Sequence, residues 1–494
     1  MTHESRRPPA AGGETVELNK CMRYWVFMIA TVVAGGGLAP AGSAAVLPTM
    51  PLPEARIESG VLSGLNEGSV QSFLGIPYAA PPVGALRWRA PQPPAPWIGT
   101  LTTDHFSASC MQRPQSRGPW TSEYRIAGPI SEDCLTINVW TPAKTGNERL
   151  AAMVWIHGGS FKSGSGSAPI YDGRKLAARG IIVVTLNYRL GVFGFLAHPQ
   201  LTAESAQRVS GNYGIMDIIA ALKWLQRNIA AFGGDPRRMT IAGQSAGAFA
   251  ADFLESSPAA RGLFHGVIAE SGSAGRDIHW RSLSEAEDRG KRYLQALALP
   301  SIDALRQLPA TRLYASDNSG EAAPDRNFPP IADGVTMPSE GDARSAANLS
   351  DIATLTGFNA DEHGSLHAPM SVAARLSLSK RARATLVDWG RRRATLSHTP
   401  LYLYLYDHVE PGPESARWGA FHGSEIPYVF DTLDAAPDRP YSRLDRQVAQ
   451  SMAGYWVNFV NTGNPNGPGL PHWPAFNSAA PAVMEIGDRH ATRR

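Results

Sequence analysis

A serine set between two glycines is the strongest chemical signal in the sequence. Ser245 stands in Gly243-Gln244-Ser245-Ala246-Gly247, between the apolar run 239–242 and small residues that can begin a helix. Glycine two positions to either side lets the backbone turn sharply from strand to helix, because no Cβ atom crowds the neighbouring elements. Such a turn presents the serine hydroxyl as a nucleophile. The pattern alone is also compatible with an incidental glycine-rich turn.

A nucleophilic serine needs a base, and the base needs an acid that orients it. His422 is our candidate base and Glu362 our candidate acid, because each follows an apolar run, 401–406 and 352–358 respectively. The order serine, glutamate, histidine is also the order in which α/β hydrolases carry these groups. Asp361, next to Glu362, remains an alternative acid.

The third requirement is a set of N–H donors for the negatively charged oxygen of the intermediate. His157-Gly158-Gly159-Ser160-Phe161 directly follows the apolar run 151–156. Its amides therefore lie at the carboxyl edge of a sheet, where open α/β proteins bind ligands. We expect Gly159, Ser160 and Ala246 to form the oxyanion hole; a flexible turn is the alternative for the glycine pair.

The elements that must position these groups follow an alternation typical of an α/β fold. A helix is predicted over 216–231, where apolar residues recur at helical spacing, and residues 46–80 and 135–140 alternate as antiparallel edge strands do. Short Val- and Ile-rich runs predict buried parallel strands at 151–156, 181–186, 239–242, 266–268, 352–358 and 401–406. We expect a large, mostly parallel, twisted sheet with helices on both faces and an antiparallel N-terminal edge.

Composition favours a small-molecule partner. The chain has 494 residues, with 46 basic and 43 acidic side chains and a net charge of +3, which is too balanced to indicate nucleic acid or a membrane surface. Residues 375–393 are locally basic and are interpreted as a solvated helix face, with a contact to an acidic substrate or a membrane as the alternative. No metal-binding pattern occurs, and the chemistry requires neither a metal nor another cofactor.

The N-terminus resembles a signal peptide. Basic residues precede an apolar stretch at 24–34, and the small residues Gly42-Ser43-Ala44 follow. We expect cleavage near Ala44, translation from Met22, and a secreted or periplasmic protein whose single catalytic domain spans 45–494. The apolar stretch is short for a membrane span, so a retained anchor is the weaker alternative.

Cleavage would leave two cysteines, Cys110 and Cys134, in a chain bound for an oxidising compartment. We predict that they form a disulfide, with two separate buried thiols as the alternative. Closing the loop between them would stabilise the fold by about 3 kcal/mol.

The chain resembles the type B carboxylesterase and cholinesterase family of α/β hydrolases. Phe232-Gly233-Gly234-Asp235-Pro236, leading into Ser245, matches its serine signature, and residues 132–140 match its second signature. The resemblance implies the α/β-hydrolase fold, a triad of Ser245, Glu362 and His422, the oxyanion hole named above, and the pairing of Cys110 with Cys134. Trp120 resembles an aromatic rim residue of the family's gorge.

The chain departs from the family pattern at several points. Ser160 takes the place of a third glycine, where a positive φ costs on the order of 1 kcal/mol. Gln244 replaces the usual glutamate, which removes a negative charge beside the imidazole and disfavours cationic substrates. His363 follows Glu362 where a glycine is usual. The short interval between Glu362 and His422 predicts trimmed helices and an open mouth.

The predicted function is hydrolysis of small-molecule carboxylic esters through an acyl-enzyme. An amide or carbamate hydrolase with the same triad is the first alternative, since loops read the leaving group. A non-catalytic interaction protein on this fold is the second. The sequence leaves the acyl chain, the alcohol and the oligomeric state open.

Overall fold

The computed structural model describes the part of the chain that carries the expected chemistry. All described residues belong to the unit Leu52–Arg494, and the predicted signal peptide, residues 1–44, lies outside them. The described residues are 53–113, 118–126, 128–272, 274, 281–315, 328–339, 350–362, 371–488 and 491–493.

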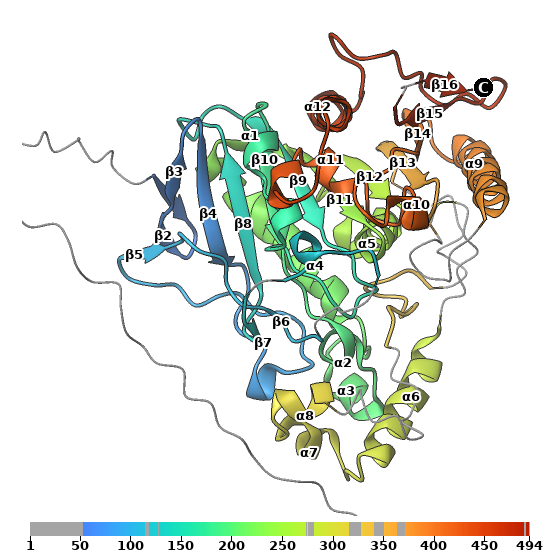
Figure 1. Ribbon diagram of the computed structural model, residues 1–494. Coiled ribbons are helices and arrows are strands. Elements are labelled where there is room, and N and C mark those ends of the chain that lie inside the picture. Colours follow the sequence, from blue (N-terminus) through green and yellow to red (C-terminus); the bar gives the residue numbers. More distant parts are fainter. Residues whose placement is uncertain are drawn as a thin grey trace, which may run out of the picture. The chain divides into compact units, whose positions relative to one another are not determined.

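An 11-stranded sheet forms the centre of this unit (Figure 1). The strands from β10 to β15 run parallel, whereas β16 at one end and β8, β4 and β3 at the other pair antiparallel. The mostly parallel sheet predicted from the sequence is therefore confirmed. In spatial order the strands are β16 (Ala491–Arg493), β15 (Val483–Ile486), β14 (Leu401–Tyr406), β13 (Ala353–Asn359), β12 (Gly266–Glu270), β11 (Gly234–Gln244), β9 (Leu150–Ile156), β10 (Ile182–Leu186), β8 (Thr136–Thr141), β4 (Val70–Pro77) and β3 (Leu65–Glu67).

The antiparallel N-terminal segment divides between this sheet and smaller ones. β3 and β4 extend the large sheet as predicted, but β1 (Glu54–Ile57) and β2 (Gly60–Ser63) pair with β5 (Thr100–Thr102) in a separate three-stranded sheet. A further pair is β6 (Ser109–Cys110) with β7 (Ile130–Ser131). The strict alternation over 46–80 predicted the strands but not their division between two sheets.

Helices cover both faces of the sheet because its strands are apolar on both sides. In β9, Ala152, Val154 and Ile156 pack into the core beneath α4 and α5, while Met153 and Trp155 pack on the opposite face with α12. The helices are α1 (Arg174–Ala177), α2 (Gly191–Phe195), α3 (Pro199–Glu204), α4 (Tyr213–Asn228), α5 (Ala246–Ser256), α6 (Leu283–Ala296), α7 (Ile302–Arg306), α8 (Ala310–Ala315), α9 (Val372–Ala394), α10 (Ser415–Trp418), α11 (Ile426–Val429) and α12 (Arg443–Thr462).

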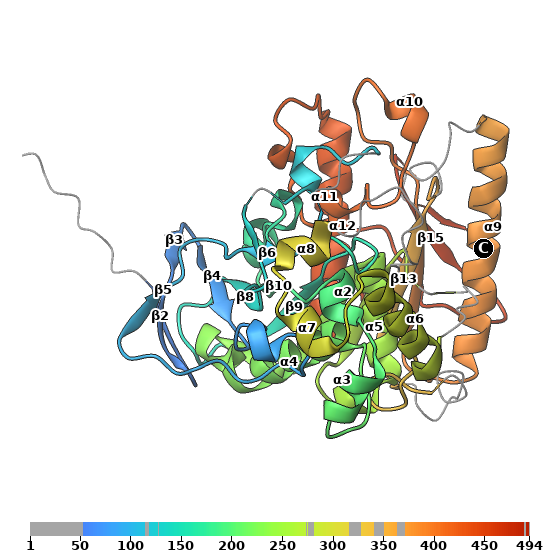
Figure 2. The same cartoon turned by 90° about the horizontal axis from the view of Figure 1, so that it is seen from below.

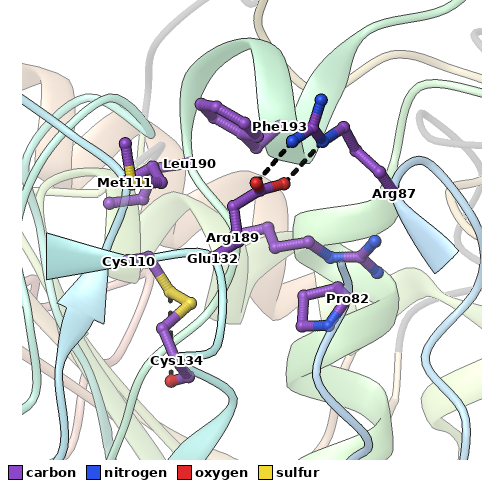
Figure 3. A pocket seen from close by; sticks show the side chains of 9 residues that line it. All are labelled: Pro82, Arg87, Cys110, Met111, Glu132, Cys134, Arg189, Leu190 and Phe193. Carbon is purple, nitrogen blue, oxygen red and sulfur yellow. Dashed lines mark hydrogen bonds and ion pairs between the residues drawn. A yellow bond between two sulfur atoms is a disulfide. The ribbon is translucent and has the colours of Figure 1, made fainter. Parts of the chain in front are cut away.

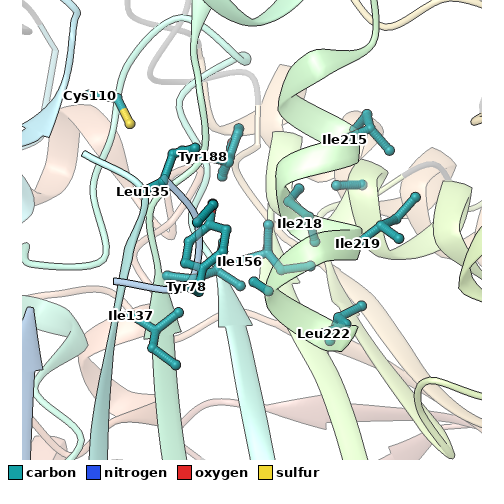
Figure 4. Packing of buried hydrophobic residues seen from close by; sticks show 14 of the residues in the cluster. Tyr78, Cys110, Leu135, Ile137, Ile156, Tyr188, Ile215, Ile218, Ile219 and Leu222 are labelled. Atoms are coloured by element: carbon teal, nitrogen blue, oxygen red, sulfur yellow. The ribbon is translucent and has the colours of Figure 1, made fainter. Parts of the chain in front are cut away.

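The helix predicted over 216–231 corresponds to α4, which begins at Tyr213 and continues into a 3-10 turn, Ile229–Phe232. Figure 4 shows Ile215, Ile218 and Leu222 of this helix facing the sheet core that contains Ile156. The apolar stripe of α4 thus packs on the same face of the sheet as α5, the helix that follows Ser245.

The basic stretch 375–393 lies on α9, which packs beside β13 and β14 (Figure 2). Most of its basic side chains are exposed, as the sequence predicts, but Arg393 is buried. Its guanidinium donates to the buried carboxylate of Glu255 and to Thr354 Oγ1, at 2.8 Å from the latter. The helix is therefore tied to the sheet by an internal ion pair at its C-terminal end.

Within the described part of the chain, no helix is both long enough and apolar enough to cross a membrane.

Candidate active site

Ser245 occupies a sharp turn between β11 and α5. Its φ of 54° and ψ of −123° are unfavourable for a residue with a Cβ atom and indicate stored backbone strain. A Cβ at Gly247 would lie 1.9 Å from the carbonyl oxygen of Ile156, so only glycine lets the turn pack against β9. The N–H of Ser245 donates to the carbonyl of Glu270 on β12 at 2.8 Å. The serine thus stands at the carboxyl edge of the sheet and directly precedes α5.

Glu362 and His422 meet at the same edge, although they follow different strands. The Glu362 carboxylate is hydrogen-bonded to His422 Nδ1, and it also accepts the hydroxyl of Ser271 and the N–H of Asn359, the latter at 2.9 Å. Burial raises the pKa of Glu362, but attraction to His422 and these hydrogen bonds outweigh burial and hold the pKa below its ordinary value. A carboxylate at Nδ1 holds the Nδ1 proton of a neutral imidazole, so Nε2 is the unprotonated nitrogen that can accept a proton.

Asp361, the alternative acid, has a different role. Its carboxylate accepts the N–H of Ala420 at 2.9 Å, and its own N–H donates to the carbonyl of Ala420 at 3.0 Å. It therefore ties the end of β13 to the loop that carries His422. The structure places Glu362, and not Asp361, against the imidazole.

Two further contacts hold His422 next to the serine turn. The side-chain amide of Gln244 lies 3.3 Å from His422 Nε2, and Gln244 immediately precedes Ser245. On the other side of the loop, the indole N–H of Trp120 donates to the carbonyl of His422 at 3.1 Å. Trp120 thus positions the loop that carries His422.

The loop after β9 lies against the nucleophile. A Cβ built on Gly158 would be 3.2 Å from the Cβ of Ser245, so the two backbones are adjacent. Gly159 and Ser160 have φ values of 108° and 57°, so the positive φ expected at Ser160 is present. The N–H of Lys162 and that of Ser163 close the turn by donating to the carbonyl of Gly159 at 2.9 and 3.0 Å.

The segment that contains the predicted disulfide braces this loop. Cys110 and Cys134 are bonded, as predicted. Gln112, two residues after Cys110, donates its side-chain N–H to the carbonyl of Gly164 at 2.7 Å, and its side-chain oxygen accepts the N–H of Gly164 at 2.8 Å. Figure 3 shows the disulfide near the ion pair of Arg87 and Glu132, whose charged atoms approach to 2.5 Å. The covalent bond and the ion pair together fix the strand ends from which the brace extends.

Comparison with known proteins places this chain in a family. The model of the carboxylesterase family matches residues 51–392 and 384–494. The chain belongs to the carboxylesterase family. It is 35% identical over 478 residues to a fumonisin B1 esterase of Sphingopyxis macrogoltabida, covering 87% of this chain and 86% of that protein.

Two further similarities concern para-nitrobenzyl esterases. This carboxylesterase is 34% identical over 461 residues to the para-nitrobenzyl esterase of Bacillus subtilis, covering 85% of this chain and 91% of the relative. A solved structure of a PNB esterase superposes with a TM-score of 0.76 at 30% identity, covering 89% of this chain and 96% of that one. The chain is accordingly a carboxylic ester hydrolase with the α/β-hydrolase fold.

Some residues that shape this carboxylesterase site were not predicted from the sequence. Ser271 donates its hydroxyl to the carboxylate of Glu362, a role that the sequence did not predict. Gln112 carries no motif, and only its place two residues after Cys110 could have drawn attention to it. Residues 363–370, which include His363, lie outside the described residues, and the open mouth stays a prediction.

The position of Gln244 predicts how a charge introduced at residue 244 would change the pH profile of this carboxylesterase. Replacing it by glutamate (Gln244→Glu) places a negative charge beside His422 Nε2, which favours the imidazolium and raises the pKa of His422. His422, our predicted base, is then protonated up to a higher pH, so the acid limb of the kcat/KM profile should move to higher pH by about 1 unit. The profile is measured between pH 5 and 9 with a p-nitrophenyl ester.

Gln92→Glu is the matched control, because the Gln92 side chain is exposed and donates to the nearby carbonyl of Ala90 at 3.0 Å. Its acid limb should coincide with that of the wild type. An unshifted Gln244→Glu profile would contradict the proximity of Gln244 to the working imidazole.

Proposed function

We propose that the chain is a serine carboxylesterase that cleaves small-molecule carboxylic esters through an acyl-enzyme on Ser245. The observation that carries the proposal is the Glu362–His422 pair, which lies beside the strained turn of Ser245 at one edge of the sheet. A buried acid that orients an imidazole next to a serine on a strand-to-helix turn is the arrangement that activates a serine hydroxyl.

In the proposed mechanism, His422 Nε2 takes the proton of Ser245 as Oγ attacks the ester carbonyl carbon. The carbonyl oxygen becomes negatively charged and accepts N–H groups of Gly159, Ser160 and Ala246, each worth about 3 kcal/mol in the transition state. The intermediate collapses, and His422 gives its proton to the departing alcohol. A water molecule then gives a proton to His422 and attacks the carbonyl carbon of the acyl-enzyme. The second intermediate collapses, the carboxylic acid is released, and His422 returns the proton to Ser245.

Two features support this oxyanion hole. The Gly158–Ser160 turn lies against Ser245 with left-handed φ values at Gly159 and Ser160, so its amides are held in a tight curve beside the nucleophile. Ala246 is the first residue of α5, and the N–H groups of a helix start are free to bind negative charge. An uncharged Gln244 beside the imidazole favours neutral esters over cationic ones.

We also propose that the protein is exported, with cleavage near Ala44. The support is the apolar stretch 24–34 with the small residues that follow it, together with the Cys110–Cys134 disulfide, which is typical of an oxidising compartment.

The test is a pre-steady-state burst. Mixing the mature protein with a p-nitrophenyl ester should release about one equivalent of p-nitrophenolate before steady turnover, because acylation of Ser245 precedes hydrolysis of the acyl-enzyme. Acid quenching and peptide mass spectrometry should locate the acyl group on the peptide that contains Ser245.

The matching p-nitroanilide and p-nitrophenyl carbamate serve as parallel substrates that address the alternatives. Turnover of the ester well above that of the anilide supports the esterase. An acyl group on any other peptide, or faster anilide turnover, would overturn the proposal.

A further inference from the structure

Two carboxyl groups that the proposed mechanism does not use are buried beneath the Glu362–His422 pair. Glu270 ends β12, immediately before Ser271, and Glu425 directly precedes α11, three residues after His422. Both side chains are fully buried, at 0% exposure. Neither forms an ion pair with a lysine or arginine among the described residues.

Each of these carboxyl groups has one oxygen that is hydrogen-bonded and one that is not. Glu270 Oε1 accepts the indole N–H of Trp456 at 2.7 Å, and Glu425 Oε2 accepts a side-chain N–H of Asn359. Glu270 Oε2, Glu425 Oε1 and the Asn359 side-chain oxygen find no hydrogen-bond partner in the part of the chain that is described. Three buried acceptors without a donor are costly unless a bound proton supplies one.

The surroundings favour the protonated form. Burial and the neighbouring charge of Glu425 raise the pKa of Glu270 well above its ordinary value. Burial and the charge of Glu362 raise the pKa of Glu425 to about 7. The other titratable groups that face the pair are His422 and three tyrosines whose own pKa values burial raises, so these stay neutral: Tyr171, Tyr404 and Tyr406.

Short hydrogen-bonded paths join this pair to the catalytic groups. Asn359 donates its backbone N–H to Glu362 at 2.9 Å and its side-chain N–H to Glu425 and to the carbonyl of Phe421, the latter at 2.7 Å. Ser271, whose hydroxyl donates to the Glu362 carboxylate, is the next residue after Glu270 in the chain. The backbone carbonyl of Glu270 in turn accepts the N–H of Ser245.

We propose that Glu270 and Glu425 form a proton-holding pair of positioning residues beneath the triad, which sets the negative charge that faces His422 during ester hydrolysis. The inference rests on the proposed function, because it assumes that His422 is the working base. Glu270 keeps its proton and donates it to Glu425 Oε1, while Glu425 is the member that ionises. No net proton leaves the pair during turnover, since Ser245, His422 and the leaving alcohol exchange their own.

The charge of the pair acts on the transition state, in which His422 is an imidazolium. While both acids are protonated, only the Glu362 carboxylate stabilises that cation. When Glu425 ionises, a second negative charge is added within the same buried region, and the imidazolium becomes more favourable. The kcat of the wild type should therefore rise further between pH 6 and pH 8, by about 3- to 10-fold beyond the titration of His422 itself.

Two isosteric variants test the assignment through the pH profile of kcat at saturating p-nitrophenyl ester. Glu425→Gln imitates the protonated acid at every pH, so it should match the wild type near pH 6 and lack the further rise towards pH 8. Glu270→Gln imitates the protonated Glu270, because its carbonyl can accept from Trp456 and its N–H can donate to Glu425. It should therefore keep the further rise.

A merely structural role predicts a different result, in which Glu425→Gln lowers kcat by one constant factor at all pH values; that outcome would overturn the inference. Loss of the rise in Glu270→Gln would equally overturn it, because Glu270 would then carry charge. If the wild type shows no hydrolysis that depends on Ser245, the proposed function fails instead.

An infrared difference spectrum between the wild type and Glu270→Gln addresses the proton independently of activity. A carbonyl stretch of a protonated carboxyl group that persists at pH 8 in the wild type alone is expected, and its absence contradicts the assignment.

Discussion

Alanine in place of Ser245 should lower kcat/KM for p-nitrophenyl esters by at least about 10⁴-fold, because the variant has no oxygen to form the acyl bond. Residual turnover would come from substrate binding and from the backbone N–H groups of the proposed oxyanion hole, Gly159, Ser160 and Ala246. Together these accelerate hydrolysis by about 10³- to 10⁴-fold over water. The fold should be unaffected or slightly stabilised, since the substitution removes only the hydroxyl. Hydrolysis is followed by p-nitrophenolate absorbance and folding by circular dichroism.

Ser256→Ala is the control for this variant. Ser256 ends α5, the helix that Ser245 precedes, and its hydroxyl bonds the carbonyl of Phe253 at 3.1 Å. Its kcat/KM should stay within about twofold of the wild type, as for a substitution away from the chemistry. Equal rates for Ser245→Ala and the wild type would exclude Ser245 as the nucleophile.

The strands and the serine turn could be predicted from the sequence because both have local causes. Strands buried on both faces must be apolar throughout, and β9, β10, β13 and β14 were each predicted to within one residue. The turn at Ser245 needs glycines that the sequence displays, and the packing distance at Gly247 shows why. Local chemistry therefore predicted the strands that precede Ser245, Glu362 and His422 along the chain.

The side-chain network could not be predicted, because it depends on which strand ends become neighbours. Asn359 ends β13 and Ser271 directly follows β12, yet both donate to Glu362. Gln112 reaches the loop after β9 from the segment that the Cys110–Cys134 disulfide anchors. Arg393 was expected in solvent, since a run of basic residues does not reveal that one of them meets the buried Glu255.

These contacts also explain why the site tolerates its departures from the family pattern. Ser160 keeps a left-handed φ because the turn at residues 159–163 is closed by hydrogen bonds and braced through Gly164 by Gln112. Gln244 replaces a charge, but its amide still contacts the imidazole. The negative charge near His422 is then supplied by Glu362 and, in our proposal, by the pair of Glu270 and Glu425.

The choice between the two neighbouring acids predicts the second large effect. Glu362→Gln should lower kcat by about 10³- to 10⁴-fold, because the neutral amide neither stabilises the imidazolium nor fixes the tautomer of His422. Ser271 and Asn359 both donate to Oε1, which the glutamine oxygen replaces, so the glutamine NH2 group would face His422 Nδ1 and favour the tautomer with its proton on Nε2. KM should change little, because the lost interaction acts mainly in the transition state.

Asp361→Asn removes the same charge one residue away and is the matched control. The asparagine oxygen can still accept the N–H of Ala420, so the loop that carries His422 keeps its anchor, and kcat should fall by no more than about fivefold. The ratio of the two losses measures which carboxylate orients the base, since both variants lose one negative charge near the same loop. A larger loss in Asp361→Asn than in Glu362→Gln would mean that Asp361 replaces Glu362 at His422 Nδ1 in the working enzyme.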